Sequence, residues 1–243
     1  MGITISFVSV KGGVGKTMLA LETASALAND FGKKVLLVDA NFSAPNIGLH
    51  LDMKDGLTLH DVLGDKEGLH AAIYESFGMD VVPSSLHFKD EIDPYKLKKV
   101  LEKHRARYDF IIIDGPPSLG LLTINSLVAA DEILIPIQSE YYALEGLGQL
   151  LETISLVQAN LKPELGIKGA VITMFDKRNK LSTSVMNELY QYFPNRVFRS
   201  VIPRSVRLAE APSYGRSILH YDPKSRGGKA YARLAREILN SEY

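Results

Sequence analysis

Seven residues near the start of the chain, Lys11-Gly12-Gly13-Val14-Gly15-Lys16-Thr17, combine two cations, three glycines and a hydroxyl in a pattern suited to phosphate chemistry. An apolar run, Ile3–Val8, precedes them and predicts a buried strand, and Met18–Ala28 after them predicts a helix. A glycine-rich turn in this position lets backbone N–H groups converge on phosphate oxygens at the positive end of the helix. Lys16 would reach the β- and γ-phosphates, and the Thr17 hydroxyl would bind Mg²⁺. A glycine-rich turn without a ligand is the alternative, and the strand and helix on either side favour the phosphate site.

Two further apolar runs each end in a carboxylate. Phe110–Asp114 delivers Asp114, and Val35–Asp39 delivers Asp39. A strand that ends in an acid beside a phosphate-binding loop places that acid near Mg²⁺. We therefore predict a metal site made by Thr17, Asp39 and Asp114, with a turn or helix-cap role as the alternative for Asp114.

The elements that must position these residues alternate along the chain. Strands are predicted at Ile3–Ser9, Val35–Asp39, Met79–Pro83, Phe110–Asp114, Glu132–Ile137, Ile167–Met174 and Val197–Val201. Helices are predicted at Lys16–Asn29, Pro94–Arg105, Leu121–Ala129, Ala143–Asn160, Leu181–Tyr192 and Gly228–Leu239. Strands rich in Val and Ile that lack polar alternation are typical of parallel strands buried on both faces. The pattern predicts one α/β domain over residues 1–243, with a doubly wound, mostly parallel sheet of about seven or eight strands and helices on both faces.

Composition excludes several classes of site. The 243 residues contain no cysteine, which rules out disulfides, thiolate metal sites and iron–sulfur clusters. No apolar run approaches the roughly 18 residues that cross a bilayer, and no basic stretch precedes the first apolar segment. We therefore expect a cytoplasmic protein.

The glycine-rich loop departs from the common P-loop pattern, because Val10 stands where the first glycine is usual and Lys11 adds a second lysine. In this form the loop resembles the deviant Walker A motif of the ParA/MinD family of ATPases. Four more blocks resemble ParA/Soj partitioning ATPases, at residues 108–125, 138–147, 201–215 and 221–227, and residues 40–50 resemble archaeal MinD-like members. The resemblance covers nearly the whole chain and implies a P-loop NTPase fold, with ATP and Mg²⁺ as cofactors.

The resemblance also implies an ATP-sandwich homodimer in which Lys11 contacts the phosphates of the partner subunit and stabilises transition-state charge, as an arginine finger does. Pro203 and Ser205 match positions that contact adenine. Met18, Met174, Phe175 and Asp176 are further candidates at the nucleotide, although core packing is an equal alternative for Met174 and Phe175.

One position departs from the family at the point where hydrolysis is carried out. Family members usually carry a second acid two residues after the one at Asp39, and here that residue is Asn41. An amide can orient a water molecule but cannot accept its proton as a carboxylate does. ATP hydrolysis is then slow, or another group serves, or the asparagine is an introduced change that traps the ATP state.

Charge is unevenly distributed although the formal net charge is zero. Residues 1–160 hold 13 Lys+Arg against 21 Asp+Glu, and residues 161–243 hold 15 against 7. A basic half suggests an anionic partner, with nucleic acid as the leading candidate and a solvated surface as the alternative. Arg178 and Arg207 match the positions through which ParA/Soj dimers bind non-specific double-stranded DNA. The surface could extend to Lys177, Lys180, Arg199, Arg204, Arg216, Lys224 and Arg226.

Two functions fit these residues. The first is a ParA-type DNA-partitioning ATPase, associated with the nucleoid as an ATP dimer and released when a ParB-like partner stimulates hydrolysis. The alternative is a MinD-like positioning or scaffold protein with little turnover, which Asn41 favours. MinD proteins bind membranes through an added amphipathic helix, whereas the apolar stripe in Gly228–Asn240 has the ordinary spacing of a helix packed on a sheet, so we expect no membrane partner.

Overall fold

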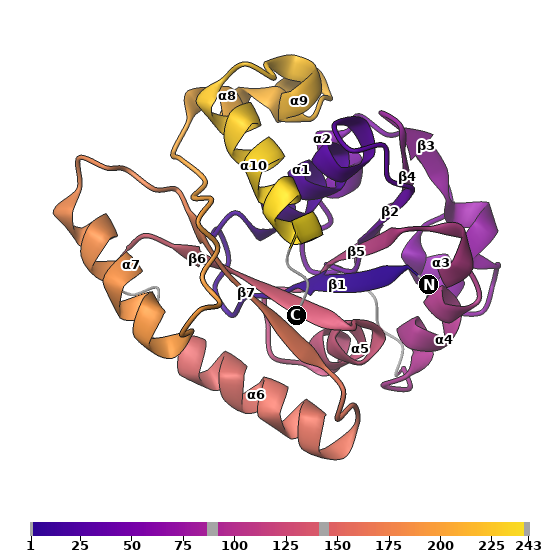
Figure 1. Ribbon diagram of the computed structural model, residues 1–243. Coiled ribbons are helices and arrows are strands. Elements are labelled where there is room, and N and C mark those ends of the chain that lie inside the picture. Colours follow the sequence, from indigo (N-terminus) through magenta and orange to yellow (C-terminus); the bar gives the residue numbers. More distant parts are fainter. Residues whose placement is uncertain (1, 87–91, 141–145, 241–243) are drawn as a thin grey trace.

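Seven short segments form one sheet in the computed structural model, which describes residues 2–86, 92–140 and 146–240 (Figure 1). The strands are β1 (Ile3–Phe7), β2 (Val35–Asp39), β3 (Tyr74–Ser76), β4 (Met79–Val82), β5 (Phe110–Asp114), β6 (Glu132–Gln138) and β7 (Gly166–Thr173). Their order across the sheet is β3-β4-β2-β5-β1-β6-β7, and every pair is parallel except β3 with β4. The predicted doubly wound, mostly parallel sheet is thus confirmed.

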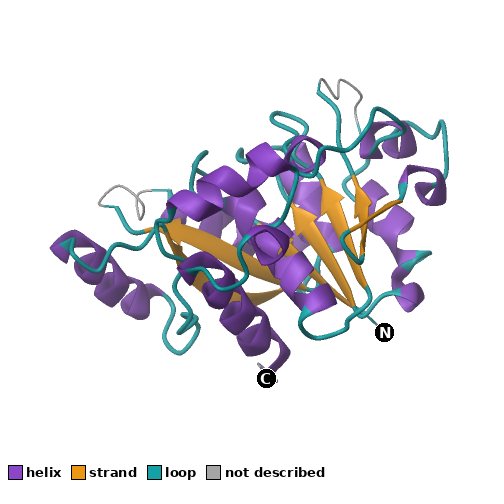
Figure 2. Ribbon diagram, turned by 90° about the horizontal axis from the view of Figure 1, so that it is seen from above, coloured by secondary structure: helices purple, strands orange, loops and turns teal. Residues whose placement is uncertain are grey.

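Helices cover both faces of the sheet (Figures 1 and 2). They are α1 (Lys16–Asn29), α2 (Ile47–His50), α3 (Leu59–Leu63), α4 (Lys96–Glu102), α5 (Leu121–Ala129), α6 (Leu147–Asn160), α7 (Lys180–Tyr192), α8 (Val206–Glu210), α9 (Ile218–Tyr221) and α10 (Arg226–Asn240). Within the described ranges, none of these helices has the length and apolar character needed to cross a bilayer.

Strand residues alternate between the two faces of the sheet, where three apolar cores lie. Leu37 of β2 and Ile112 of β5 join α1 and α10 in a core on one face, whereas Leu36 and Ile111 face the core formed with α3 and α4. A further core on that second face joins β6 and β7 to α5, α6 and α7. Both faces of each central strand are buried, which explains why their sequences are apolar without alternation.

One predicted strand is wrong. Residues 197–201 form no strand beside β7, where only an isolated bridge joins Ala170 to Val197. The backbone N–H groups of Arg199 and Ser200 instead donate to the Glu237 carboxylate of α10, at 3.1 and 3.0 Å. The segment still runs beside β7, since the N–H of Phe198 donates to Ala170 and that of Ile202 donates to Ile172. Because the two N–H groups between them are bound by Glu237, the segment does not form a regular strand.

The predicted helices differ from the observed ones mainly at their ends. Pro94–Arg105 narrows to α4 and is followed by a 3₁₀ turn at Arg105–Arg107, whereas Gly228–Leu239 lengthens to α10. Within Ala143–Asn160, the helix is described from Leu147, and residues 143–145 lie outside the described ranges. The prediction missed β3 and the short helices α2, α3, α8 and α9, which are too brief to show a helical period.

An ionisable side chain is buried between α1 and α9. Glu22 is fully buried, and its Oε1 accepts the N–H of Ile218 at 2.8 Å. Its Oε2 has no hydrogen-bond partner among the described residues. Burial raises the pKa of Glu22 to about 8, because the loss of hydration outweighs the single backbone hydrogen bond.

Glu22→Gln is expected to make unfolding less sensitive to pH. The folded-state pKa lies above the ordinary value of 4.5, so wild type binds an extra proton when folded and loses stability as pH rises from about 4.5 to about 8. Glutamine keeps an acceptor for Ile218 and does not titrate. The stability of the variant relative to wild type should therefore increase by a few kcal/mol over this range, at about 1.4 kcal/mol per pKa unit.

Thermal unfolding at several pH values between 5 and 9 measures this difference. The exposed Glu102 of α4 provides the matched control, because Glu102→Gln removes the same charge without changing a buried group. A difference between Glu22→Gln and wild type that stays constant with pH would contradict the assignment.

Candidate functional site

The glycine-rich loop joins the end of β1 to the start of α1, at the carboxyl edge of the parallel strands. Gly13 and Gly15 have φ of 76° and 83°, a left-handed conformation that glycine adopts without steric cost. Gly15 is the N-cap of α1 and has no side chain to cover the N–H groups of the first turn. These donors and the positive end of the helix dipole form a site suited to phosphate.

Lys16, Thr17 and Asp114 come together behind this loop. Lys16 is 6% exposed, and its Nζ lies 2.5 Å from Oδ1 of the fully buried Asp114. The Thr17 hydroxyl donates to Oδ2 of the same carboxylate at 2.6 Å. Gly115 lets the chain turn here, since a Cβ at this position would lie 3.0 Å from the carbonyl oxygen of Phe7. The structure therefore brings the glycine-rich loop into contact with Asp114 at the end of β5, as the sequence predicts.

Asp39 lies beside Asp114, because the two are paired in the register of β2 and β5. Its two carboxylate oxygens accept the N–H groups of Asn41 at 3.0 Å and Ile47 at 3.2 Å. Burial, and secondly the negative charge of Asp114, raise the pKa of Asp39 to about 7. Two adjacent buried carboxylates and a hydroxyl are hard oxygen ligands that a divalent cation would neutralise, so the residues present fit Mg²⁺.

Asn41 lies where the segment after β2 passes the loop. It is 4% exposed, and its Oδ1 accepts the N–H of Ala44 at 3.2 Å. The amide oxygen therefore helps to shape the turn that leads into α2. Asn41 also lines the cavity in front of the loop.

That cavity has a volume of about 500 Å³. Of the residues predicted to bind nucleotide, it is lined by Lys11, Gly12, Gly13, Gly15, Lys16, Thr17, Met18, Met174, Pro203 and Ser205. Val14, Phe175 and Asp176 do not line it. The carbonyl oxygen of Val14 accepts the Thr173 hydroxyl at 2.7 Å, and Phe175 packs against the core beside β7. Val14 and Phe175 therefore support the residues that line the cavity without lining it themselves.

Sequence reasoning missed several lining residues: Ala44, Asn46, Pro117, Thr173, Ile202, Arg204, Leu208, Ala209 and Tyr231. Most belong to α8, α10 and the segment before α8, which are distant in sequence from the loop. Met174 has φ of 52°, which is unusual for a residue other than glycine, and its carbonyl oxygen accepts the Ser139 hydroxyl at 3.1 Å. No local sequence signal marks this conformation.

The basic candidates lie around this end of the molecule, and three of the arginines are paired with acids. Arg178 Nη2 lies 2.7 Å from Asp176 Oδ2 although the Arg178 side chain is 85% exposed, and the pair holds the pKa of Asp176 well below its usual range. Arg207 pairs with Glu210 at 3.1 Å, and Arg204 pairs with Glu140 at 3.2 Å. The remaining candidates are Lys177, Arg199, Arg216, Lys224 and Arg226, which are exposed, and Lys180, whose side chain lies outside the described part of the chain.

Comparisons with known proteins agree with this geometry. Residues 2–167 match the family described as AAA domain. The chain is 44% identical to the sporulation initiation inhibitor protein Soj of Bacillus subtilis and 43% identical to the chromosome-partitioning ATPase Soj of Treponema pallidum, with 98% of each chain covered in both comparisons. Its fold is similar to that of the septum site-determining protein MinD of Pyrococcus horikoshii, solved with Mg-ADP (TM-score 0.83, 28% identity, 99% and 97% of the two chains covered).

Proposed function

Because the chain belongs to the family of Soj and ParA chromosome-partitioning ATPases, we propose that it is a DNA-partitioning switch whose ATP-bound homodimer binds double-stranded DNA without sequence specificity. The protein is an ATPase with ATP and Mg²⁺ as cofactors. We further propose that residues 1–243 form one ATPase domain, since all seven strands belong to one sheet.

The observation that carries this proposal is the contact of Lys16 and Thr17 with the buried Asp114. The loop N–H groups and Lys16 would bind the phosphates, and Thr17 and Asp114 would hold Mg²⁺, which supplies charge neutralisation at the reacting phosphate. Asp39 adds negative charge at that site and holds the segment from Asn41 to Ile47 through two backbone hydrogen bonds. Met174, Pro203 and Ser205, together with the apolar side of the cavity, would enclose the base.

The position of Lys11 supports the proposed dimer. It lies at the start of the loop, is partly exposed and lines the cavity. A second subunit placed over the cavity would bring its own Lys11 toward the phosphates. Such a cation stabilises the charge that develops as the γ-phosphate leaves.

Hydrolysis is proposed to be slow because the residue at position 41 is an amide. Asn41 can orient the attacking water from the cavity wall, but no proton can be transferred to it. The alternative function, a MinD-like positioning or scaffold protein with little turnover, is favoured by this residue alone. In the partitioning function, a ParB-like partner stimulates hydrolysis, and the dimer then leaves the DNA and the nucleoid.

DNA binding is proposed to use Arg178 and Arg207, supported by Lys177, Lys180, Arg204 and Arg216. In the structure, Arg178 and Arg207 are bound to acidic neighbours. A phosphate group would have to replace these partly exposed carboxylates, which is feasible because ion pairs at a protein surface contribute little to stability. The dimer doubles the number of such contacts.

The test is DNA binding by polarisation with ATP, with ADP and without nucleotide, at about 50 and 200 mM salt. We expect ATP to raise the affinity, and Arg178→Glu/Arg207→Glu to remove most of that increase, because each lost phosphate contact weakens binding to all sequences. Lys34→Glu/Lys103→Glu changes the same charge at two exposed residues elsewhere and should bind like wild type. An affinity that does not depend on ATP, or an Arg178→Glu/Arg207→Glu variant that keeps the full ATP effect, would argue against this use of the site.

A further inference from the structure

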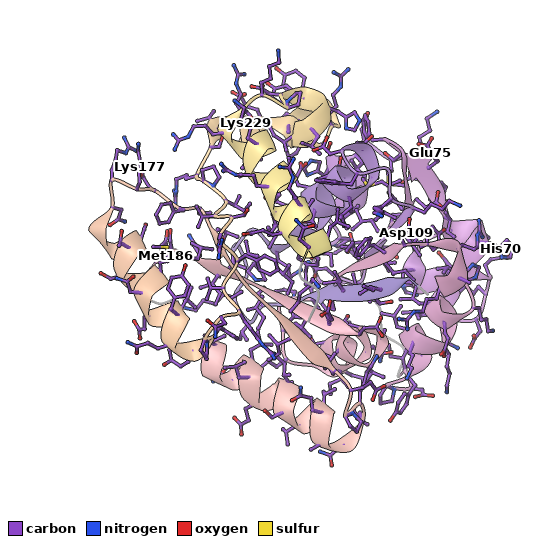
Figure 3. The ribbon with its side chains drawn as sticks, in the orientation of Figure 1. His70, Glu75, Asp109, Lys177, Met186 and Lys229 are labelled. Carbon is purple, nitrogen blue, oxygen red and sulfur yellow. The ribbon has the colours of Figure 1, made fainter. Side chains whose placement is uncertain are left out.

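Tyr231 reaches the nucleotide cavity from α10 with a side chain that the protein almost encloses. The residue is 1% exposed and belongs to the apolar core that joins α10 to α1. It also lines the cavity of about 500 Å³ in front of the glycine-rich loop. Figure 3 labels Lys229, an exposed residue two positions earlier in the same helix. Residues two positions apart lie on nearly opposite sides of a helix, so Tyr231 lies on the inner side of α10.

A close contact fixes α10 beside α8, which lines the same cavity. A Cβ at Gly227 would lie 2.7 Å from Cγ of Leu208, so a larger residue at position 227 would push the two helices apart. Leu208 itself lines the cavity. The packing of α10 on α8 therefore sets the position of Tyr231 relative to bound nucleotide.

The hydroxyl of Tyr231 forms no hydrogen bond with any residue that the structure describes. A buried tyrosine usually has a partner for this group, because a hydroxyl without one loses the hydrogen bonds that it makes in water. The hydroxyl does not belong to the fully enclosed polar atoms without a partner, of which Oε2 of Glu22 is one. It is therefore in contact with the space that the Tyr231 side chain lines, which is the nucleotide cavity.

The Tyr231 hydroxyl keeps its proton at neutral pH. Burial, and secondly the negative charge of Glu22, raise the pKa of Tyr231 well above its ordinary value of 10.0. A neutral phenol can donate one hydrogen bond. The cavity thus contains a donor that is held in place by the core and is not used by any described residue.

The residues around Tyr231 suit a purine base better than a ribose or a phosphate. Ile202 and Leu208 line the cavity and belong to the same apolar core as Tyr231, and Met18 packs against that core. A purine is a flat ring whose nitrogen atoms accept hydrogen bonds in the plane of the ring. A ribose carries two hydroxyl groups, which would lose their water against this apolar wall. The phosphates belong at the loop, beside Lys16.

We propose that the Tyr231 hydroxyl donates a hydrogen bond to a ring nitrogen of adenine, and that it thereby selects and orients the base of ATP. Sites for small molecules commonly combine an apolar wall with a few polar groups that fix the orientation of the ligand. The base supplies the acceptor that the hydroxyl otherwise lacks. This role rests on the proposed placement of the base beside Met174, Pro203 and Ser205, and it adds a specificity-determining residue from α10.

The experiment measures calorimetric binding of Mg-ADP to wild type and to Tyr231→Phe, which lacks only the hydroxyl. ADP is used because the proposed dimer forms with ATP. The ligand set also contains deaza-ADP analogues, in each of which one ring nitrogen of adenine is replaced by CH, and 2′-deoxy-ADP. Tyr108→Phe is the matched control, because the buried Tyr108 donates its hydroxyl to Asp80 at 2.6 Å and does not line the cavity.

We expect Tyr231→Phe to bind Mg-ADP about tenfold more weakly than wild type, which is the effect of losing one hydrogen bond to a ligand. One deaza analogue should bind wild type about tenfold more weakly than ADP, and should bind Tyr231→Phe as tightly as ADP does. Without nucleotide, Tyr231→Phe should keep the melting temperature of wild type, because the lost hydroxyl has no partner among the described residues. Tyr108→Phe should show the opposite pattern, a lower melting temperature with unchanged affinity for ADP.

Three results would overturn the role of Tyr231. The first is a Tyr231→Phe variant that binds Mg-ADP as tightly as wild type. The second is a set of deaza analogues that lose the same affinity in both proteins, since another group would then contact the ring nitrogens. The third is a penalty for 2′-deoxy-ADP that disappears in Tyr231→Phe, which would assign the hydroxyl to the ribose.

Met174→Ala in the same assay separates this role from the placement of the base. If Met174→Ala weakens ADP binding and Tyr231→Phe does not, the base lies where it is proposed and only the role of Tyr231 is wrong. If neither substitution changes the affinity for ADP, the proposed placement of the base is wrong as well.

Discussion

Asn41→Asp is expected to hydrolyse ATP at least about a hundredfold faster than wild type, since a positioned general base contributes 10²–10⁴ in rate. The side chain lines the cavity and is 4% exposed, so a carboxylate there would face bound nucleotide in a site from which bulk water is largely excluded. The new carboxylate can still accept the N–H of Ala44, which should keep the turn intact. Steady-state phosphate release with Mg²⁺, with and without DNA, measures the change.

The same substitution should destabilise the protein when Mg²⁺ is absent. Asp39 and Asp114 already lie side by side without exposure to solvent, and a third buried carboxylate nearby adds repulsion between like charges. A melting temperature that falls without Mg²⁺ and recovers with Mg-ADP would support this reading. Asn41→Ala is the control for the loss of the amide and should not gain activity. If folded Asn41→Asp turned over ATP at the wild-type rate, another group would have to activate the water.

Lys16→Ala is expected to reduce ATP binding and hydrolysis by about a hundredfold or more, which is the effect of removing one preorganised charge contact to the transition state. Lys16 is the buried cation at the loop, and it lies against Asp114. Its removal leaves Asp114 and Asp39 without that cation, so the two acids would repel each other and the phosphates more strongly. Equilibrium binding of a fluorescent ATP analogue separates lost affinity from lost turnover.

Lys34→Ala is the matched control, since it removes an exposed lysine just before β2 and should leave ATP binding as in wild type. Lys11→Ala provides a second comparison. It should retain ATP binding in the isolated subunit better than Lys16→Ala, because Lys11 is proposed to act on the nucleotide of the other subunit. Equal loss of binding in Lys11→Ala and Lys16→Ala would contradict that division of roles.

The central part of the fold could be predicted because its signals are local. The segments that became β2 and β5 are unbroken apolar runs that end in an acid, and α1 and α5 begin and end where their sequences predict. The short helix α2 could not be found in this way. Its first N–H, from Ile47, donates to Asp39, so a tertiary contact rather than a helical pattern fixes where it begins.

The residues of the candidate site likewise fall into those that the sequence predicts and those that it does not. The spacing of two motifs predicts the roles of Lys16, Thr17 and Asp114. The structure places Lys16 and Thr17 within hydrogen-bond distance of Asp114. Tyr231 and Leu208 reach the cavity from α10 and α8, whose approach depends on how the chain returns to the sheet. The segment 197–201 shows the limit most clearly, because its strand-like residues are held by Glu237, which lies 36 residues after Val201 in the chain.

The contact between Glu237 and the backbone of Arg199 and Ser200 also bears on solubility. A parallel sheet exposes unpaired N–H and C=O groups at its outer strands, and another chain can add to such an edge and start a fibre. Beside β7, the neighbouring segment occupies backbone groups of Ala170 and Ile172, and Glu237 binds the N–H groups of Arg199 and Ser200. The exposed Arg199 lies on this segment. At the opposite edge, β3 is only three residues long. Both borders of the described sheet are thus poor templates for strand addition, which protects the protein from aggregating through its own sheet.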